Sequence, residues 1–482
     1  MKRYLFATTL LFAHYIACSQ LPADSIKAII KREIAGKRSK SIVVGIIDAS
    51  GRQIYSEGIL SDQKPLRPDA NTVYEIGSIT KVFASVLLAE MNIKGQLNLT
   101  DPISKYLPAS VKSPVRNGRE ITLLSLSTHR SGMPRFPYNP YPKNMDNPYA
   151  DYTEVDLFAY VSHFEPEYDF DTRWRYSNVA YGLLGNILSR IAKKDFESMT
   201  RETICRPLNM PSTAIRSTKQ MRANTAGGHA ITGQPTVSLE LGALEAAGAL
   251  RSNANDLLTF AAANLGLIKT DLLAALELTH VLQAKKDGND TYTTMGWTLA
   301  NDSGRELLFK DGGTPGYRTF LGIDKEKKIG IVVLSNTDNS VTDIGWHILD
   351  PNHKVEAYRY PWTLLDTLRI TVRKRGADAA LKLHDELKSA NDSAHQFGEQ
   401  QLDHLGHELR RGGKMADAAK IFEHNAKLYP KATLVYVSLG EIYRRTGSSE
   451  RATTYLEKAL ALEPGNEHLK RMLGSLKKRK GK

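Results

Sequence analysis

The 482-residue chain is 41 % hydrophobic and 24 % charged, with 35 glycines, 20 prolines and two cysteines, which excludes disordered, collagen-like and disulfide-built proteins. Its formal net charge of +13 is concentrated at the ends, because Lys2, Arg3 and five cations within 477–482 account for more than half of it. The remaining cations form no basic stripe interleaved with aromatic residues, so we exclude a nucleic-acid partner. The length suffices for two or three domains, each with a hydrophobic core.

Residues 1–19 have the three-part form of a secretory signal peptide. Two cations precede an apolar run over 5–17 that is too short to span a bilayer and ends at small residues. Cys18 resembles the lipid-attachment cysteine of bacterial lipoproteins, and cleavage after Ser19 is the alternative. We therefore expect an exported protein that is either periplasmic or tethered to the outer membrane through Cys18. Cys205 is expected to be a buried, inert thiol.

Strand patterns occur at both ends of a long central region. Residues 41–48 and 53–57 flank a tight turn, and a second hairpin pattern covers 318–324 and 329–336. The sequence between them shows mostly helical patterns with capping residues. This arrangement predicts an α+β domain over 21–360, in which an antiparallel sheet is built from both ends of the domain and a helical lobe is inserted between them.

The pattern Ser-x-x-Lys occurs three times, and its context distinguishes one copy. Ser78 and Lys81 follow Gly77 and are the one copy that leads into a long apolar helical pattern, over 82–92. A serine on the first turn of a buried helix lies near backbone N–H groups, and a lysine three residues later lies on the same face. This geometry suits a nucleophile with an adjacent base. The lysine must then be largely neutral, which predicts a second positive group nearby.

Two later segments carry further candidate residues. Tyr176-Ser-Asn178 precedes a helical pattern, and the glycine-rich segment 310–316, which begins with Lys310, follows a strand pattern over 304–309. Taken singly, Tyr176 is typical of a core phenol, Asn178 of a helix cap and Lys310 of a solvated strand residue.

Metal chemistry has little support in the sequence. There is no His-Glu-x-x-His motif, no paired cysteines and no Gly-x-Ser-x-Gly motif. His404 and His407 are one helical turn apart, but we expect both at the surface of a repeat region. We therefore expect neither a metal nor an organic cofactor.

The last part of the chain contains an internal repeat of 34 residues. Leu-Gly pairs recur at 405, 439 and 473, and Pro430 and Pro464 have the same spacing. This period and pattern resemble tetratricopeptide repeats, apart from Asn425 where alanine is usual. We predict an all-α repeat domain over 361–482, in which the stretch 362–398 packs as a preceding helix pair and the last unit is a truncated cap. Such an array either stabilises the protein or binds a protein partner.

The motifs Ser78-Ile-Thr-Lys81, Tyr176-Ser-Asn178 and Lys310-Asp-Gly312 occur in the order found in one family of serine hydrolases. Together they resemble the β-lactamase and D,D-peptidase (penicillin-binding) family, in particular its class C-like branch, which has Tyr-x-Asn as its second motif. The resemblance covers about 40–340 and includes the segment 121–134. It implies a β-lactamase/transpeptidase-like fold for this domain.

The resemblance also implies a role for each motif residue. Ser78 would be the acylated nucleophile, Lys81 its proton partner and Tyr176 the phenol that shuttles protons. Asn178 would bind the substrate amide and orient Lys81, while Lys310 would supply a positive field for the phenol and for an anionic substrate.

Glycines complete this inferred site. The backbone N–H groups of Ser78 and Gly313 would form the oxyanion hole, and glycine at 312 and 313 would let a substrate backbone approach closely. Gly312 and Gly313 are therefore included with Asn178 and Lys310 among the expected substrate-binding residues.

Asp311 departs from the family pattern, which has threonine or serine between the lysine and glycine of the third motif. A carboxylate facing the site would repel a substrate carboxylate, but alternation along a strand also allows Asp311 to point away or to pair with Lys310. The departure disfavours efficient β-lactamase and D-Ala carboxypeptidase activity.

The sequence thus predicts an exported serine hydrolase that acts through a Ser78 acyl-enzyme on an ester or amide, as an esterase or a D-amino-acid peptidase. One alternative is a β-lactamase or D,D-carboxypeptidase acting on β-lactams or peptidoglycan peptides. Another is a non-catalytic, penicillin-binding-like scaffold that recruits a protein through its repeats.

Overall fold

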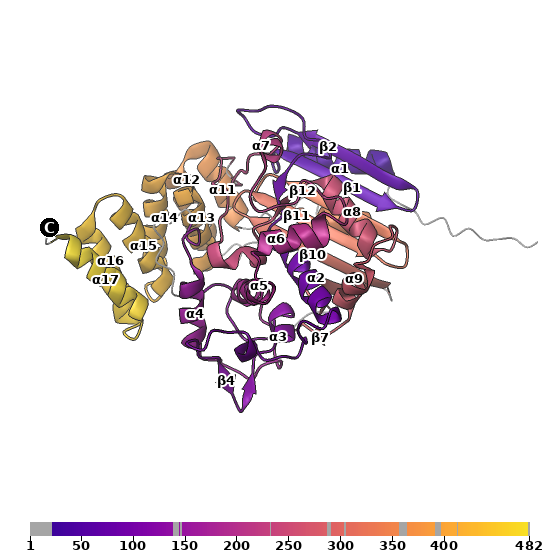
Figure 1. Cartoon of the computed structure of the whole chain (residues 1–482). Helices are drawn as coiled ribbons and strands as arrows, with labels where there is room; N and C mark the ends of the chain where they lie inside the picture. The colour runs from indigo at the N-terminus through magenta and orange to yellow at the C-terminus, as the bar shows by residue number, and fades with distance from the viewer. Residues whose placement is uncertain are drawn as a thin grey trace, which may run out of the picture.

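The computed structural model describes most of the chain (Figure 1). The described residues are 22–137, 144, 147–231, 233–286, 291–302, 305–355, 364–390, 397–411 and 413–480. The predicted signal peptide over 1–19, Cys18 and the predicted domain boundary at 360 lie outside them. Within these ranges no helix combines the length and the apolar character needed to cross a membrane.

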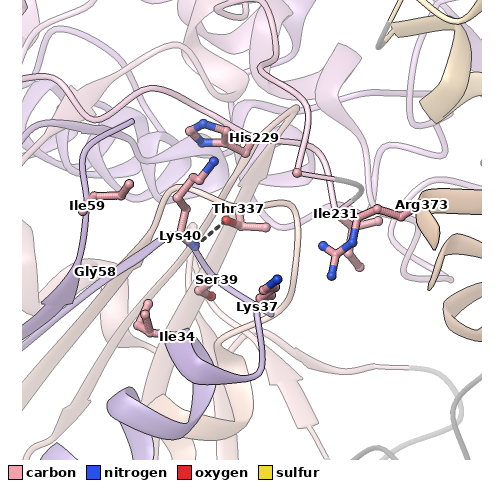
Figure 2. A pocket seen from close by; sticks show the side chains of 11 residues that line it. Ile34, Lys37, Ser39, Lys40, Gly58, Ile59, His229, Ile231, Thr337 and Arg373 are labelled. Atoms are coloured by element: carbon pink, nitrogen blue, oxygen red, sulfur yellow. Dashed lines mark hydrogen bonds between the residues drawn. The ribbon is translucent and has the colours of Figure 1, made fainter. Parts of the chain in front are cut away.

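An antiparallel sheet of eight strands forms the centre of the first domain, in the order β2-β1-β12-β11-β10-β9-β8-β7. The strands are β1 (Ser41–Asp48), β2 (Gly51–Gly58), β7 (Ala284–Lys285), β8 (Thr291–Thr293), β9 (Thr298–Asp302), β10 (Arg305–Thr314), β11 (Tyr317–Asp324) and β12 (Ile329–Ser335). β1 pairs with β12, so the sheet is built from both ends of the domain, as predicted. The Lys40 N–H donates to Thr337 Oγ1 (2.9 Å), which links the segment before β1 to the segment after β12 (Figure 2).

Helices cover both faces of this sheet. Alternate side chains of β1 enter different clusters, because Val44 packs with α1 (Ala23–Ala35) and α10 (Thr342–Leu349), whereas Val43 belongs to the larger core. The larger core also contains residues of α2 (Thr80–Ile93), α8 (Ala254–Asn264) and α9 (Leu273–His280).

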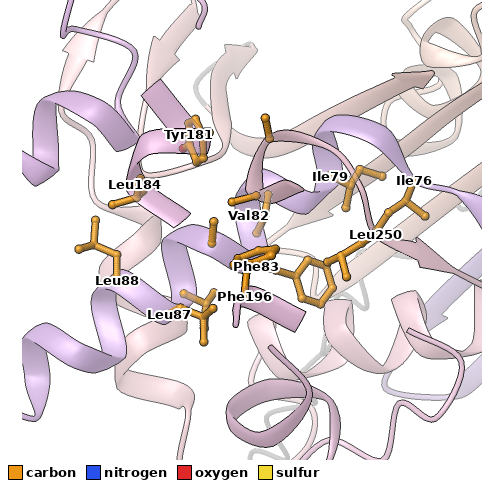
Figure 3. Packing of buried hydrophobic residues seen from close by; sticks show 14 of the residues in the cluster. Ile76, Ile79, Val82, Phe83, Leu87, Leu88, Tyr181, Leu184, Phe196 and Leu250 are labelled. Atoms are coloured by element: carbon orange, nitrogen blue, oxygen red, sulfur yellow. The ribbon is translucent and has the colours of Figure 1, made fainter. Parts of the chain in front are cut away.

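The α2 helix is buried on almost every side. Phe83 stacks on Phe260 of α8 with ring centroids 4.4 Å apart. Figure 3 shows Val82 and Leu87 of α2 among side chains from α5 (Asn178–Ala192), α6 (Phe196–Thr200) and the segment around Leu250. A helix that is apolar all round belongs in a core, and this burial fixes the position of the residues at its start.

The predicted helical lobe lies between the two halves of the sheet in the chain. It comprises α3 (Leu123–Ser127), α4 (Glu154–Ser162), α5, α6 and α7 (Lys219–Ala223). Two short strand pairs accompany these helices. In one, β3 (Tyr74–Glu75) pairs with β6 (Arg251–Ser252), and in the other, β4 (Val115–Arg116) pairs with β5 (Arg119–Glu120). Cys205 is buried, as predicted.

The C-terminal region consists of helix pairs and a final single helix (Figure 1). Its helices are α11 (Leu364–Arg375), α12 (Ala377–Ser389), α13 (Glu399–Arg411), α14 (Met415–Leu428), α15 (Thr433–Arg445), α16 (Ser449–Leu462) and α17 (Glu467–Lys480). A Cβ on Gly440 would lie 2.6 Å from Leu456, and one on Gly406 would lie 2.7 Å from Phe422, so glycine lets the paired helices approach closely. The pair α11–α12 precedes the repeats and α17 caps them, as predicted.

Candidate active site

Ser78 lies in the 3₁₀ turn Gly77–Ile79, which leads directly into α2. Gly77 has a φ of +51°, and a Cβ at this position would lie 2.6 Å from the backbone nitrogen of Gly313. Glycine alone tolerates both this conformation and this close approach. The turn therefore packs against β10, and Ser78 is half-buried at the edge of the core.

Lys81 lies one helical turn beyond Ser78, and its side chain is fully buried. Its Nζ donates hydrogen bonds to Ser78 Oγ (3.1 Å), Asn178 Oδ1 (2.8 Å) and the carbonyl oxygen of Ala247 (2.5 Å). Three acceptors match the three protons of an ammonium group. Tyr176 Oη is 2.5 Å from Ser78 Oγ, so the serine hydroxyl contacts both the amine and the phenol.

Tyr176 and Asn178 are positioned by the start of α5. The side chain of Ser177 caps this helix by accepting a hydrogen bond from the Ala180 N–H (2.9 Å). Asn178 is therefore the first residue of the helix rather than its cap, and its amide oxygen is free to accept from Lys81.

Lys310 is a buried residue of β10, not a solvated one, with 5 % of its surface exposed. Its Nζ lies 5.0 Å from the centroid of the Tyr176 ring, and Lys81 Nζ lies 4.9 Å from the same centroid. Two cations thus flank the phenol. Lys310 is the second positive group that the sequence predicted near Lys81. The expected neutral lysine is not required, because the pKa values below assign the role of base to Tyr176.

Burial and these cations set the protonation of the amine and the phenol. Burial lowers the pKa of Lys81 to about 8; Tyr176 opposes this decrease and Lys310 adds to it. Burial raises the pKa of Tyr176, but Lys81 and Lys310 outweigh this effect and lower the pKa to about 7. Between these two values the pair consists of an ammonium and a phenolate, and the phenolate can accept the proton of Ser78.

We expect kcat/KM for a neutral ester to follow a bell-shaped pH profile with limbs near pH 7 and pH 8. At lower pH the Tyr176 phenol is protonated and cannot accept a proton; at higher pH Lys81 loses the charge that stabilises the phenolate. In Lys310→Gln the acid limb should move to higher pH, because a cation that lowers the pKa of Tyr176 is absent. An acid limb that stays in place would contradict this assignment.

The glycines of β10 lie where its backbone meets the turn that carries Ser78. A Cβ on Gly312 would lie 2.0 Å from the carbonyl oxygen of Ile76, an oxygen that also accepts a hydrogen bond from Thr319 Oγ1 (3.0 Å). The contact between Gly77 and Gly313 brings the backbones on both sides of the predicted oxyanion hole together.

A cavity of about 530 Å³ opens over this group. The residues that line it are Ser78, His129, Arg135, Trp174, Tyr176, Lys286, Thr293, Trp297, Thr298, Lys310, Asp311, Gly312, Gly313 and Arg318. Among these described residues, Asp311 is the single acid and it is exposed, whereas four are lysine or arginine. A cavity of this charge attracts an anionic substrate group.

Asp311 is one of the residues that line the cavity, and it is exposed. It forms no ion pair with Lys310 within the part of the chain that the structure describes, so this lysine does not neutralise its charge.

The sequence interpretation missed several cavity residues. Trp174 and Arg135 are close in sequence to Tyr176 and to the segment 121–134, so proximity to these motifs could have indicated them. No motif close in sequence to Lys286 or Arg318 could have indicated that they line the cavity. Lys286 Nζ donates to Thr298 Oγ1 (2.6 Å), and burial together with the repulsion of Lys310 lowers its pKa to about 7.

His129 holds the backbone on both sides of Tyr176. The Arg175 N–H donates to the His129 carbonyl oxygen (2.8 Å), and the Ser177 N–H donates to His129 Nδ1 (3.1 Å). The His129 ring lies 4.5 Å from the Tyr176 ring, centroid to centroid. Burial lowers the pKa of His129 well below its usual value, with further contributions from Lys310 and Lys81, so the ring is neutral and Nδ1 is free to accept.

One group of described residues, outside the catalytic cavity, has the composition of a metal site. Ligand atoms of His384, Asp385 and His424 lie within 4.8 Å of one another. Asp385 Oδ1 contacts His424 Nε2 (2.8 Å) and His384 Nδ1 (3.2 Å), so it can accept a hydrogen bond from both rings. A metal on His384 Nδ1 would place a proton on its buried Nε2, which has no hydrogen-bond partner among the described residues. His404 is exposed and His407 is half-buried.

A family model described as Beta-lactamase matches residues 26–349. The chain belongs to the β-lactamase family. A second model, for a tetratricopeptide repeat, matches residues 434–466.

Relatives in this family include β-lactamases and a peptidase. A β-lactamase of Providencia stuartii is 30 % identical over 347 residues, which cover 65 % of this chain and 85 % of that protein. D-alanyl-D-alanine-carboxypeptidase/endopeptidase AmpH of Escherichia coli K12 is 26 % identical over 313 residues, covering 62 % and 80 %.

Solved structures show the same fold. A class C β-lactamase from Rhodobacter sphaeroides superposes with a TM-score of 0.58 at 23 % identity, covering 66 % of this chain and 95 % of that one. The octameric penicillin-binding protein homologue from Pyrococcus abyssi has a TM-score of 0.61 at 22 % identity, covering 69 % and 78 %. The predicted fold class and family are confirmed, and this β-lactamase-family protein is a serine hydrolase.

Proposed function

We propose that this β-lactamase-family protein forms an acyl-enzyme at Ser78 and hydrolyses the amide bond of peptides ending in D-alanyl-D-alanine, with β-lactams as further acylating agents. The named activities of the relatives favour this alternative over the esterase interpretation that the sequence suggested first. The single observation that carries the proposal is the contact of Ser78 with both Lys81 and Tyr176 at the edge of a cationic cavity.

In the first step Ser78 Oγ attacks the substrate carbonyl carbon while its proton passes to the Tyr176 phenolate. The N–H groups of Ser78 and Gly313 would stabilise the oxyanion. The tetrahedral intermediate collapses when Tyr176 returns the proton to the leaving nitrogen, which departs as an amine and leaves the acyl group on Ser78.

Deacylation repeats these steps with water as the nucleophile. Tyr176 accepts a proton from water, hydroxide adds to the acyl carbon, and the proton returns to Ser78 Oγ as the acid product leaves. Throughout, Lys81 holds the charge that stabilises the phenolate, and Asn178 fixes the position of Lys81 through its 2.8 Å hydrogen bond. Lys310, whose Nζ lies 5.0 Å from the ring centroid, also favours the phenolate.

Asp311 is expected to limit activity on substrates that end in a carboxylate. In Asp311→Thr we predict that kcat/KM for a D-Ala-D-Ala peptide and for a cephalosporin rises by about tenfold or more, because a repelling carboxylate is replaced by a hydroxyl. The isosteric change Asp311→Asn should give part of this gain, whereas activity on a neutral ester should stay within about twofold. Equal changes for charged and neutral substrates would contradict the electrostatic explanation.

An esterase is the second candidate, and the exposed position of Asp311 in the cavity is the observation that favours it. Steady-state rates on a D-Ala-D-Ala peptide, a chromogenic cephalosporin and a short acyl ester distinguish the two functions. The proposal predicts measurable release of D-alanine that requires Ser78. Hydrolysis of the ester without hydrolysis of the peptide would support the esterase instead.

The cellular location and a protein partner are part of the proposal. We propose that the leader over 1–19 directs export, with Cys18 as the candidate lipid attachment site. Tetratricopeptide-type helix pairs commonly bind proteins, so a protein partner for the C-terminal region is part of the same proposal.

A further inference from the structure

A second cavity of about 450 Å³ lies at the edge of the sheet beside α11, the first helix of the C-terminal region (Figure 2). Its walls come from the end of α1 and the segment between α1 and β1, the end of β2 with the residue after it, the loop around His229, the segment after β12, and α11. This volume lies within the range of small-molecule sites, and junctions between domains are common places for them.

Cations from both parts of the protein converge on this cavity. Lys37 and Lys40 belong to the hydrolase domain, and Arg373 belongs to α11. Figure 2 shows the Arg373 guanidinium directed toward the cavity beside Ile231. A Cβ on Gly233 would lie 3.9 Å from an Arg373 Nη, so this side chain reaches the loop of the other domain.

One of the three cations is already neutralised. Lys40 Nζ forms a short ion pair with Asp62. Lys37 and Arg373 have neither an ion pair nor a hydrogen bond from their side chains within the described part of the chain, and no acid is among the described residues that line the cavity. Burial lowers the pKa of His229, which is therefore neutral and adds no charge. Lys37 and Arg373 are both exposed, so an anion from solvent has access to each of them.

The lining also contains three large apolar side chains. Ile34 and Ile59 lie on one side of the cavity, and Ile231 lies beside Arg373. An occupant that matches both features has one anionic group and a flexible hydrocarbon body. An arginine side chain binds a carboxylate through two parallel hydrogen bonds, which suits Arg373 to this group.

We propose that this cavity binds a medium-chain carboxylate, with the carboxylate between Lys37 and Arg373 and the acyl chain against the three isoleucines. The ligand joins the hydrolase domain to α11. This site is separate from the catalytic cavity, with which it shares no lining residue.

Calorimetric titration of the full chain with decanoate tests the proposal, with decanol and inorganic phosphate as matched probes. Decanoate should bind at least about tenfold more tightly than either probe, because decanol lacks the anionic group and phosphate lacks the hydrocarbon chain. Equal binding of decanol would show a purely apolar cavity, and equal binding of phosphate would show a simple anion site; both results would overturn the proposal.

Single-residue variants test whether decanoate binds in this cavity. Lys37→Gln and Arg373→Gln should each weaken decanoate binding by about tenfold or more, while the neighbouring exposed change Lys374→Gln should leave it unchanged. Lys310→Gln serves as a second control, since the catalytic cavity is also cationic. If Lys310→Gln removes binding and Lys37→Gln does not, decanoate occupies the catalytic cavity and the proposal is wrong. Unchanged melting temperatures show that the variants are folded.

Discussion

Replacing Ser78 by alanine is expected to lower kcat by at least about 10⁴-fold for every substrate, because no acyl-enzyme can form. The fold should survive the change. Lys81 keeps its hydrogen bonds to Asn178 and to the Ala247 carbonyl oxygen, so the cost in folding free energy should be about 1 kcal/mol. Steady-state kinetics and thermal unfolding of the same preparation check both parts.

Ser61→Ala is the matched control, because Ser61 and Lys64 form another Ser-x-x-Lys pattern in the chain. Ser61 Oγ accepts a hydrogen bond from the Lys64 backbone N–H in a surface turn and lines no part of the catalytic cavity. This variant should keep its activity. Turnover by Ser78→Ala within tenfold of the wild type would show that another group is the nucleophile.

Removing only the Tyr176 hydroxyl is expected to lower kcat by about 10²- to 10⁴-fold, the usual contribution of a positioned acid and base. In Tyr176→Phe the ring contacts with His129 and Trp174 are retained, so the fold and the cavity shape should persist. The pKa of Lys81 should fall further, since the phenolate that raises it is absent. The remaining activity should lack the acid limb near pH 7.

Tyr181→Phe separates this effect from a general loss of buried hydroxyl groups. Tyr181 is also buried near Lys81, whose Nζ is 5.5 Å from its ring centroid, but its hydroxyl bonds to Ser85 and to the Ser127 carbonyl oxygen. This change should reduce stability and leave the pH profile in place. If the two variants lost activity equally, Tyr176 would have no distinct role in proton transfer.

Local sequence patterns predicted the parts of the site that local structure positions. Ser78 and Lys81 share a face because they lie one turn apart on α2, and Tyr176 precedes a recognisable helix start. The strands β1, β2, β10, β11 and β12 could be predicted because strand alternation and tight turns are also local signals, whereas the short strands β7, β8 and β9 were missed. The repeat region could be predicted from its 34-residue period.

Features that depend on packing between distant segments could not be predicted from local sequence patterns. Lys286 and Arg318 reach the catalytic cavity from separate strand regions, and nothing around them in the sequence marks them. The burial of Lys310 depends on where β10 lies relative to α5. The decrease that Lys310 causes in the pKa of Tyr176 could therefore be inferred only through the family resemblance. The sequence does not determine whether the Asp311 side chain faces the cavity, because alternation alone does not fix the direction of a side chain at a strand end.

The most direct test of the central claim is the mass of the intact protein after incubation with a penicillin and, separately, with a fluorophosphonate, followed by peptide mapping. The account predicts one adduct from each reagent, both on Ser78 and both absent from Ser78→Ala. Labelling by the fluorophosphonate alone would contradict the proposed peptidase specificity and favour an esterase. Labelling by neither reagent, in a folded preparation, would contradict the acyl-enzyme mechanism and leave a non-catalytic binding protein as the better explanation.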